Sequence, residues 1–212
     1  MIRKLLGRAY GKIHYFFYGP KRYRNIYRIL QKTRPKRIME IGVWTGERSI
    51  RMIETLKKYY AADAIDYYGF DLFEDLSDEQ LVSEVSKKPP TKAQIQEKLE
   101  KTGANIHLFK GNTLETLPRE TQSLPKMDFV FLDGGHSLET IENDWKYVKE
   151  LMHEKTVVIF DDYWNRTNAG CKPLIDSLYK EGKYFVKVLQ PQDTFQKEDG
   201  LLTINFALVR KQ

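Results

Sequence analysis

Cysteine is almost absent from this chain of 212 residues, since Cys171 is its only one. A single cysteine excludes a disulfide within the chain and a metal centre built from several thiolates. Long apolar runs are missing too, because no stretch approaches the ~20 uncharged residues that a membrane-spanning helix needs. Basic residues at positions 3, 4, 8 and 12 also argue against a secretory signal. We therefore expect a cytoplasmic protein.

Acidic residues are absent before Glu40, whereas twelve Lys and Arg residues fall in that part of the chain. The remainder has 23 basic and 29 acidic residues, so the net charge of +6 combines +12 from the first 39 residues with −6 from the rest. Aromatic residues are interleaved with the basic ones. Such a segment, residues 1–34, suits an anionic membrane surface, an acidic partner or nucleic acid. The structural alternative is a pair of amphipathic helices with solvated Lys and Arg side chains.

Four short apolar runs, rich in branched or aromatic residues, are each followed at once by a glycine or an acidic residue. Runs of this kind are typical of buried strands in a parallel sheet. Ligands of open α/β sheets bind beyond the carboxyl ends of the strands, so we expect the polar residues to share one edge. The four runs are residues 37–41, 67–70, 127–132 and 156–160.

The pattern predicts one α/β domain over residues 35–212, preceded by the helical extension 1–34. We expect helices over residues 2–17, 21–33, 47–60, 91–101, 137–153 and 169–181. Strands are expected over residues 37–41, 67–71, 105–110, 127–132, 156–160, 184–189 and 201–209. The last two strands should pair antiparallel, because a polar loop of about eleven residues without a helix joins them. Residues 72–103 are long for a connection and are expected to fold over the edge as a lid.

The turn from Gly42 to Gly46 follows the acidic Glu40. In a dinucleotide site a second glycine would let the backbone approach a diphosphate, but here Trp44 fills that position. The turn therefore suits a ligand without a diphosphate. Asp71, after the second strand, can accept hydrogen bonds from a ribose diol, and residues 112–113, after the third, can contact an adenine edge.

Together these motifs resemble the class I S-adenosylmethionine-dependent methyltransferases over about residues 35–210. The resemblance implies a Rossmann-like, doubly wound sheet of seven strands in the order 3-2-1-4-5-7-6, with the last strand antiparallel. Another doubly wound nucleotide-binding domain is the alternative. The residues implied to contact S-adenosylmethionine are Glu40, Gly42, Trp44, Gly46, Asp71, Asn112, Thr113 and Asp133.

Asp133, Asp161 and Asp162 follow the fourth and fifth strands, which are neighbours in this topology. Three close carboxylates favour a cation between them, and oxygen ligands suit Mg²⁺ or Ca²⁺. Alternatively, one aspartate caps a helix and another binds loop backbone. The sequences at residues 133–136 and 161–163 resemble metal-dependent O-methyltransferases, closest to the sugar and small-metabolite branch rather than the catechol branch. This resemblance implies an Mg²⁺ site formed by the three aspartates.

His136 stands where catechol-type enzymes have a lysine base. A neutral imidazole can take a proton at neutral pH, so we expect His136 to deprotonate an acceptor hydroxyl next to the cation at Asp133. The hydroxyl oxygen would then attack the methyl group of the cofactor. An ordinary loop histidine bonded to Asp133 or Asp161 is the alternative.

The predicted function is therefore an Mg²⁺-dependent O-methyltransferase of a small hydroxylated metabolite, such as a sugar or a glycosylated natural product. One alternative is ribose methylation of nucleic acid with the help of the basic segment 1–34. The chain lacks the Asn/Asp-Pro-Pro-aromatic tetrad of base-amino methylases, which argues against methylation of base amino groups but does not exclude ribose methylation. A non-catalytic nucleotide-binding domain is the other alternative. Segment 1–34 is also a candidate for peripheral membrane binding or for forming a homo-oligomer.

Overall fold

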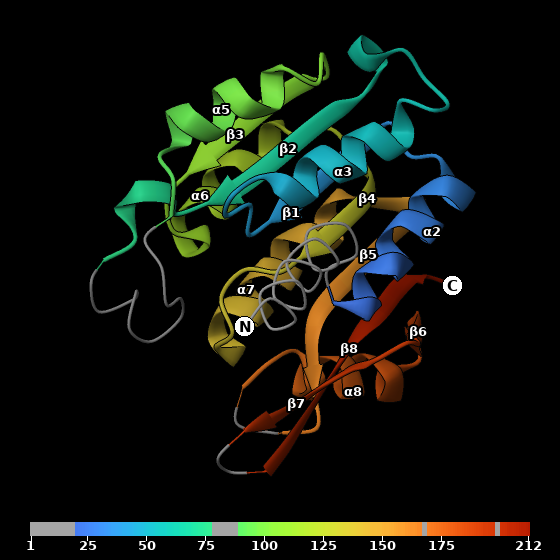
Figure 1. The fold of residues 1–212 in the computed structure, drawn as a ribbon. Helices are drawn as coiled ribbons and strands as arrows, with labels where there is room; N and C mark the ends of the chain where they lie inside the picture. Colours follow the sequence, from blue (N-terminus) through green and yellow to red (C-terminus); the bar gives the residue numbers. More distant parts are fainter. Residues whose placement is uncertain (1–19, 78–88, 167–168, 198–199) are drawn as a thin grey trace, which may run out of the picture.

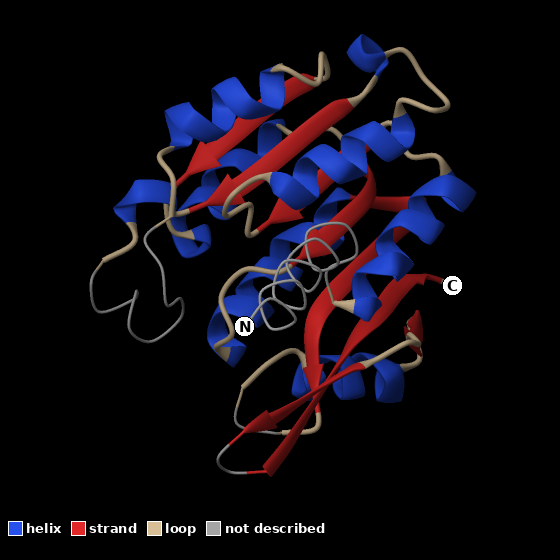
Figure 2. Ribbon diagram, viewed as in Figure 1, coloured by secondary structure: helices blue, strands red, loops and turns tan. Residues whose placement is uncertain are grey.

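Helices cover both faces of one central β-sheet in this computed structural model (Figures 1 and 2). The structure describes residues 20–77, 89–166, 169–197 and 200–212. The eight strands are β1 (Arg37–Ile41), β2 (Asp66–Asp71), β3 (Asn105–Lys110), β4 (Met127–Leu132), β5 (Met152–Trp164), β6 (Tyr184–Val188), β7 (Asp193–Lys197) and β8 (Gly200–Lys211).

The strand order is β3-β2-β1-β4-β5-β8-β6, and β7 pairs with β8 beside this path. Strands β1 to β5 pair in parallel, whereas β8 runs antiparallel to β5, β6 and β7. The predicted doubly wound sheet with an antiparallel closing strand is confirmed, with β8 in the place of the predicted seventh strand.

The helical elements connect these strands. The α-helices are α2 (Arg24–Thr33), α3 (Glu47–Leu56), α5 (Lys92–Glu100), α6 (Thr113–Glu120), α7 (Leu138–Val148) and α8 (Lys172–Glu181). Short 3₁₀ turns are η1 (Lys21–Tyr23), η2 (Ala62–Ala64), η3 (Phe73–Asp75), η4 (Thr121–Ser123) and η5 (Lys149–Leu151). No helix among these described residues is long and apolar enough to cross a membrane.

Alternation along the strands divides the core into two halves, because successive side chains point to opposite faces of a sheet. Ile38 of β1 packs in the half covered by α2, α3 and α5, which contribute residues such as Leu30, Ile53 and Leu99. Its neighbour Met39 packs in the other half, covered by α6, α7 and α8. Both faces of the sheet are therefore buried, as parallel strands require.

Side-chain caps explain where three of the helices begin. Thr91 and Gln94 form a reciprocal capping box at the start of α5. The side chain of Asn112 accepts a hydrogen bond from the Leu114 amide and begins α6, and Ser137 does the same for α7 through the Thr140 amide. The predicted start at Ser137 is confirmed, whereas helix α6 was not anticipated.

The strand prediction needs two corrections. Strand β5 continues to Trp164 rather than ending at Phe160, because β8 supplies backbone partners to Tyr163 and Trp164 after a register shift. The loop that was expected to join the last two strands contains a further strand, β7, which forms a hairpin with β8. Figure 1 shows this hairpin projecting beyond the helix layers.

Two helices end several residues before their predicted ends. Helix α3 ends at Leu56 and α7 at Val148, ahead of the expected ends at residues 60 and 153. The expected helix over residues 2–17 lies outside the described residues. So does the middle of the proposed lid, residues 78–88. Within the rest of that segment, Ile95 and Leu99 of α5 are buried in the core, so α5 belongs to the helix layer.

Candidate functional site

The register of the parallel strands brings four predicted site residues to one edge of the sheet. Ile41 pairs with both Phe70 and Leu132, and Leu132 pairs with Phe160. The residues that follow these strand positions are Gly42, Asp71, Asp133 and Asp161. They therefore form a row across β1, β2, β4 and β5, at the edge where α/β sheets bind ligands.

Gly42 allows the first turn to lie directly against β4. Its φ is +92°, and a Cβ atom there would lie 1.9 Å from the carbonyl oxygen of Asp133. The Gly42 amide donates to the Phe70 carbonyl at 2.9 Å, and the Asp133 amide donates to the Ile41 carbonyl at 2.8 Å. Only glycine fits this position, because the backbone that follows β4 fills the space that a Cβ atom would need.

Asp71 fastens the same turn from the side of β2. Its Oδ2 atom accepts hydrogen bonds from the Val43 and Trp44 amides at 2.7 and 2.8 Å. Its Oδ1 atom accepts one from the Phe73 amide at 2.7 Å. A carboxylate offers about four acceptor sites, so Oδ1 retains capacity for one further donor. The predicted ribose contact is therefore compatible with this geometry, but the structural role of Asp71 was not anticipated.

Trp44 and Gly46 complete the turn in the left-handed backbone conformation. Trp44 has φ +48° and is 46% exposed, so its indole stands at the mouth of the turn. A positive φ is unusual for a bulky residue, and the Asp71 hydrogen bond to its amide holds it there. Gly46, with φ +70°, is the N-cap of α3.

Glu40 lies beneath the turn and is fully buried. Its Oε2 atom accepts hydrogen bonds from Ser49 and Tyr67, both at 2.5 Å, while Oε1 is buried without a partner among the described residues. Burial raises the pKa of Glu40, and burial together with the Glu40 carboxylate raises that of Tyr67 well above its usual range. Since unpaired buried acceptors are rare, Oε1 is a candidate to receive a donor from a ligand.

Asn112 and Thr113 lie at the start of α6, beyond β3. The Asn112 side chain is engaged as the N-cap of that helix. Thr113 is buried, and its carbonyl accepts a hydrogen bond from Asn143 of α7 at 3.0 Å. Their predicted adenine contacts stay predictions, because both residues have a structural role here.

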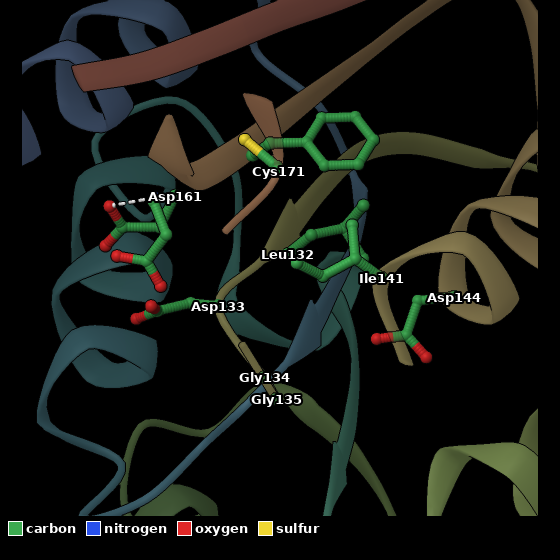
Figure 3. Close-up of a pocket in the computed structure, with 10 residues that line it drawn as sticks. Leu132, Asp133, Gly134, Gly135, Ile141, Asp144, Asp161 and Cys171 are labelled. Carbon is green, nitrogen blue, oxygen red and sulfur yellow. Dashed lines mark hydrogen bonds between the residues drawn. The ribbon is translucent and has the colours of Figure 1, made fainter. Parts of the chain in front are cut away.

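Asp133 and Asp161 project to the same side of the strand edge (Figure 3). Arg22 of η1 donates to Asp161 from Nε and Nη2 at 2.8 and 2.9 Å, and the Tyr23 hydroxyl donates to Asp161 at 2.8 Å. Arg48 of α3 donates to Asp133. Two arginines thus neutralise the two carboxylates.

Burial would raise the pKa of both aspartates, but their partners differ. For Asp161, the Arg22 guanidinium and its hydrogen bonds outweigh burial and hold the pKa below its usual range. For Asp133, burial and the nearby carboxylates Asp161 and Asp162 outweigh Arg48 and raise the pKa well above its usual range.

The Asp162 carboxylate has hydrogen-bond partners that differ from those of the other two aspartates. Asp162 has φ +58°, its Oδ1 atom accepts a hydrogen bond from the Trp164 indole at 2.8 Å, and its Oδ2 atom lies 3.0 Å from Nε2 of His136. The rings of His136 and Trp164 are 5.5 Å apart. His136 therefore pairs with Asp162, rather than with Asp133 or Asp161 as the alternative interpretation had it.

The three aspartates do not converge as metal ligands in this arrangement. Within the ranges that the structure describes, no group of three or more His, Cys, Asp and Glu side chains is placed to hold a metal ion. Both oxygens of Asp161 and the Oδ2 atom of Asp133 face arginine donors, and the oxygens of Asp162 face His136 and Trp164. This donor set does not fit Mg²⁺, which requires open carboxylate oxygens.

A small pocket opens behind this edge, between β4, β5 and α7 (Figure 3). Cys171 and Asp144 line it together with the glycines that follow Asp133. Asp144 is 3% exposed, with one oxygen lacking a partner among the described residues, and burial raises its pKa to about 7. Figure 3 shows Asp144 on the opposite side of the pocket from Asp133 and Asp161.

Sequence reasoning missed the residues that hold the aspartates. Arg22 and Tyr23 lie in the basic segment that was set apart from the domain, and Asp193, which binds Arg22, lies in the presumed loop. Of these residues, only Arg48 could have been linked to the aspartates from the sequence. It follows the glycine turn directly, so it lies at the start of a helix close to the acidic residues that follow the strands.

The fold and site geometry define the class I methyltransferase architecture, and comparisons with known proteins agree. Residues 39–163, more than half of the chain, match the family described as "Methyltransferase domain". The chain belongs to this family, which confirms the predicted methyltransferase class. No curated protein sequence matches the chain.

Similar solved structures share the fold at low sequence identity. The O-methyltransferase from Bacillus cereus in complex with S-adenosylhomocysteine has a TM-score of 0.62 and 15% identity, covering 91% of this chain and 81% of that one. The O-methyltransferase TomG from Streptomyces achromogenes, involved in tomaymycin synthesis and bound to S-adenosylmethionine, has a TM-score of 0.61 and 15% identity, covering 90% and 79%. Precorrin-6y C5,15-methyltransferase from Geobacter metallireducens has a TM-score of 0.53 and 15% identity, covering 88% and 87%.

Proposed function

We propose that this chain transfers a methyl group from S-adenosylmethionine to an oxygen atom of a small hydroxylated acceptor. The observation that carries the proposal is the row of Gly42, Asp71 and Asp133 across three adjacent strand ends in a methyltransferase fold. Solved structures with the same fold include O-methyltransferases that bind S-adenosylmethionine or S-adenosylhomocysteine.

The residues of this edge fit the cofactor in three respects. Gly42 lets the turn lie directly against Asp133 at the end of β4, Asp71 Oδ1 can accept a ribose hydroxyl, and the orphaned Oε1 atom of Glu40 lies beneath the turn. Trp44 stands exposed at the mouth and can cover a bound ligand. When bound, S-adenosylmethionine supplies the methyl group as an electrophile on a sulfonium centre.

On the acceptor side, His136 is the group that takes the proton from the reacting hydroxyl. Its side chain is 36% exposed, so an acceptor can reach it, and Asp162 lies 3.0 Å from its Nε2 atom. The Trp164 indole fixes Asp162 in turn, so the imidazole is held in one orientation. A positioned neutral imidazole is an effective general base near neutral pH.

The arrangement of the aspartates among the described residues does not support the predicted magnesium dependence, and no step of the mechanism uses a metal ion. The choice of a sugar or a glycosylated natural product as acceptor, the anionic membrane surface for residues 1–34 and self-association stay predictions. Nucleic-acid ribose methylation and a purely binding role remain as alternatives, with no described contact in their favour.

The direct test is methyl transfer from S-adenosylmethionine carrying a radioactive methyl group to a panel of phenols, sugars and glycosides. We expect His136→Ala to lower turnover by about 10²- to 10⁴-fold with little change in cofactor affinity. His153→Ala is the matched control, because His153 pairs with Asp128 at the opposite end of the strands. Full activity in His136→Ala would remove this residue as the base, and transfer to none of the hydroxylated acceptors would count against the proposal.

A further inference from the structure

Arg22 and Asp161 form a bidentate ion pair inside the candidate site. Nε of Arg22 lies 2.8 Å from Oδ1 of Asp161 and Nη2 lies 2.9 Å from Oδ2, so the planar guanidinium faces both carboxylate oxygens. The two side chains are 7% and 1% exposed. Buried bidentate pairs of this kind are strong and geometrically specific.

The position of Arg22 is fixed from several sides. Asp193 of β7 accepts hydrogen bonds from the Lys21 and Arg22 amides at 2.7 and 3.0 Å, and from Arg22 Nη1 at 3.2 Å. The guanidinium also lies over the rings of Tyr23 and Phe206, 4.7 and 5.6 Å from their centroids. Arg22 is therefore part of the packed domain and not a surface side chain that happens to reach an aspartate.

Arg48 neutralises Asp133 from the other side. Its guanidinium carbon lies 4.1 Å from the centroid of the Tyr23 ring, so the two arginines flank the same phenol. The Tyr23 hydroxyl donates to Asp161 at 2.8 Å and lies 3.4 Å from Asp133. Tyr23 thus links the two ion pairs into one network.

We propose that Arg22 and Arg48 occupy the place of the divalent cation that was predicted between Asp133 and Asp161, so that the acceptor site works without a metal. This inference rests on the proposed function. To bind Asp161, a metal ion would have to displace two charge-assisted hydrogen bonds and lie next to two guanidinium groups. Mg²⁺ sheds its water reluctantly, so it competes poorly for oxygens that are already paired.

The test is a titration of the full chain with Mn²⁺, followed by electron paramagnetic resonance of the free ion, on the wild type and on Asp161→Asn. We expect no bound Mn²⁺ that depends on Asp161. Mn²⁺ bound equally by both proteins lies elsewhere and agrees with the proposal. One Mn²⁺ per wild-type chain that is lost in Asp161→Asn would overturn it.

A second variant tests whether Arg22 occupies the predicted cation position between Asp133 and Asp161. Arg22→Gln removes the charge and leaves both aspartates, so a folded variant should gain an Mn²⁺ site that the wild type lacks. Arg28→Gln, an exposed arginine of the next helix, is the matched control and should not. A folded Arg22→Gln protein that still binds no Mn²⁺ would contradict the role of Arg22. If that variant does not fold, the wild-type titration still decides.

S-adenosylmethionine binding is measured by calorimetry in the same metal-free samples. The cofactor turn involves neither Arg22 nor Mn²⁺, so the calorimetric result is independent of the metal titration. Absence of cofactor binding would count against the proposed function alone, whereas an Asp161-dependent Mn²⁺ site would count against the inference alone.

Discussion

A side chain at position 42 would occupy space that the backbone next to β4 already fills. The nearest atom to a Cβ there is the Asp133 carbonyl oxygen at 1.9 Å, and the φ of +92° disfavours any residue with a Cβ. Gly182 follows α8 and has φ +68°. A Cβ atom added there would meet no other group within 4 Å. The two glycines therefore separate backbone strain from steric collision.

We predict that Gly42→Ala lowers the free energy of unfolding by at least about 2 kcal/mol, because strand β4 must move away from the turn. Gly182→Ala, with strain but no collision, should cost about 1 kcal/mol. Urea unfolding of both variants measures the difference. Equal costs for the two substitutions would show that the turn does not press on β4 as described.

The buried carboxyl of Asp144 gives a prediction about pH. Its pKa is raised to about 7 by burial, above the value of about 3.9 expected in the unfolded chain. At a pH between these two pKa values, the folded state holds a proton that the unfolded state has lost. The contribution of this group to the free energy of unfolding therefore falls as the pH rises from the lower pKa to the higher one. Below pH 4 the group is protonated in both states and contributes no pH dependence.

Asp144→Asn should therefore remove part of the pH dependence of stability between pH 4 and 7, on the order of 4 kcal/mol at most. The measurement compares urea midpoints of the wild type and the variant at pH 5 and pH 8. The wild type should lose more stability than the variant on going to pH 8. Parallel pH profiles would mean that Asp144 titrates normally in the folded protein.

At the scale of the element, η1 is joined to a strand 171 residues away in the sequence. Asp193 of β7 accepts from two backbone amides and one guanidinium nitrogen of η1, and its side chain is 11% exposed. The hairpin of β7 and β8 thereby holds the turn that carries Arg22 and Tyr23 to the site. The site therefore depends on a strand that lies beside the main path of the sheet.

We predict that Asp193→Ala loosens η1, because three donors lose their acceptor at once. The free energy of unfolding should fall by about 2 kcal/mol. The more specific result is faster hydrogen exchange at the Lys21 and Arg22 amides. Gln196→Ala, an exposed position on the same strand, is the control. Unchanged exchange at those two amides in Asp193→Ala would show that other contacts hold η1.

The elements that could be predicted from the sequence are those that local patterns specify. Strands β1, β3 and β4 have the expected ends, because short apolar runs bounded by glycine or acidic residues are buried strands. Strand β5 passes through Asp161 and Asp162, since partners on β8 decide its length and no local signal reveals them. Strand β7 was missed for the same reason, being polar and mostly exposed.

The acidic and glycine residues of the candidate site could be predicted, but their partners could not. Asp133 and Asp161 follow apolar runs, which places them at the edge of the sheet. The ion pair of Arg22 and Asp161 joins residues 139 positions apart, and charge alone does not choose among the twelve basic residues before Glu40. A metal ion was predicted because the sequence shows three aspartates at neighbouring strand ends. It does not show the arginine side chains that the fold places beside them.

At the scale of the whole molecule, three layers and one strand order account for the site. Both faces of the sheet are covered by helices, so the carboxyl ends of the parallel strands are the open edge available to a ligand. Solved methyltransferases with about 15% identity share this fold. Gly42 and the carboxylate of Asp71 lie on that edge.

The most direct measurement is a calorimetric titration of S-adenosylmethionine into the full chain in the presence of EDTA. The account predicts one binding site per chain, with affinity lowered at least about tenfold in Asp71→Ala, because that variant loses the anchor of the turn and the ribose acceptor together. The exposed Asp63→Ala should bind as the wild type does. No heat of binding from the folded wild type, or unchanged affinity in Asp71→Ala, would contradict a cofactor site at this edge.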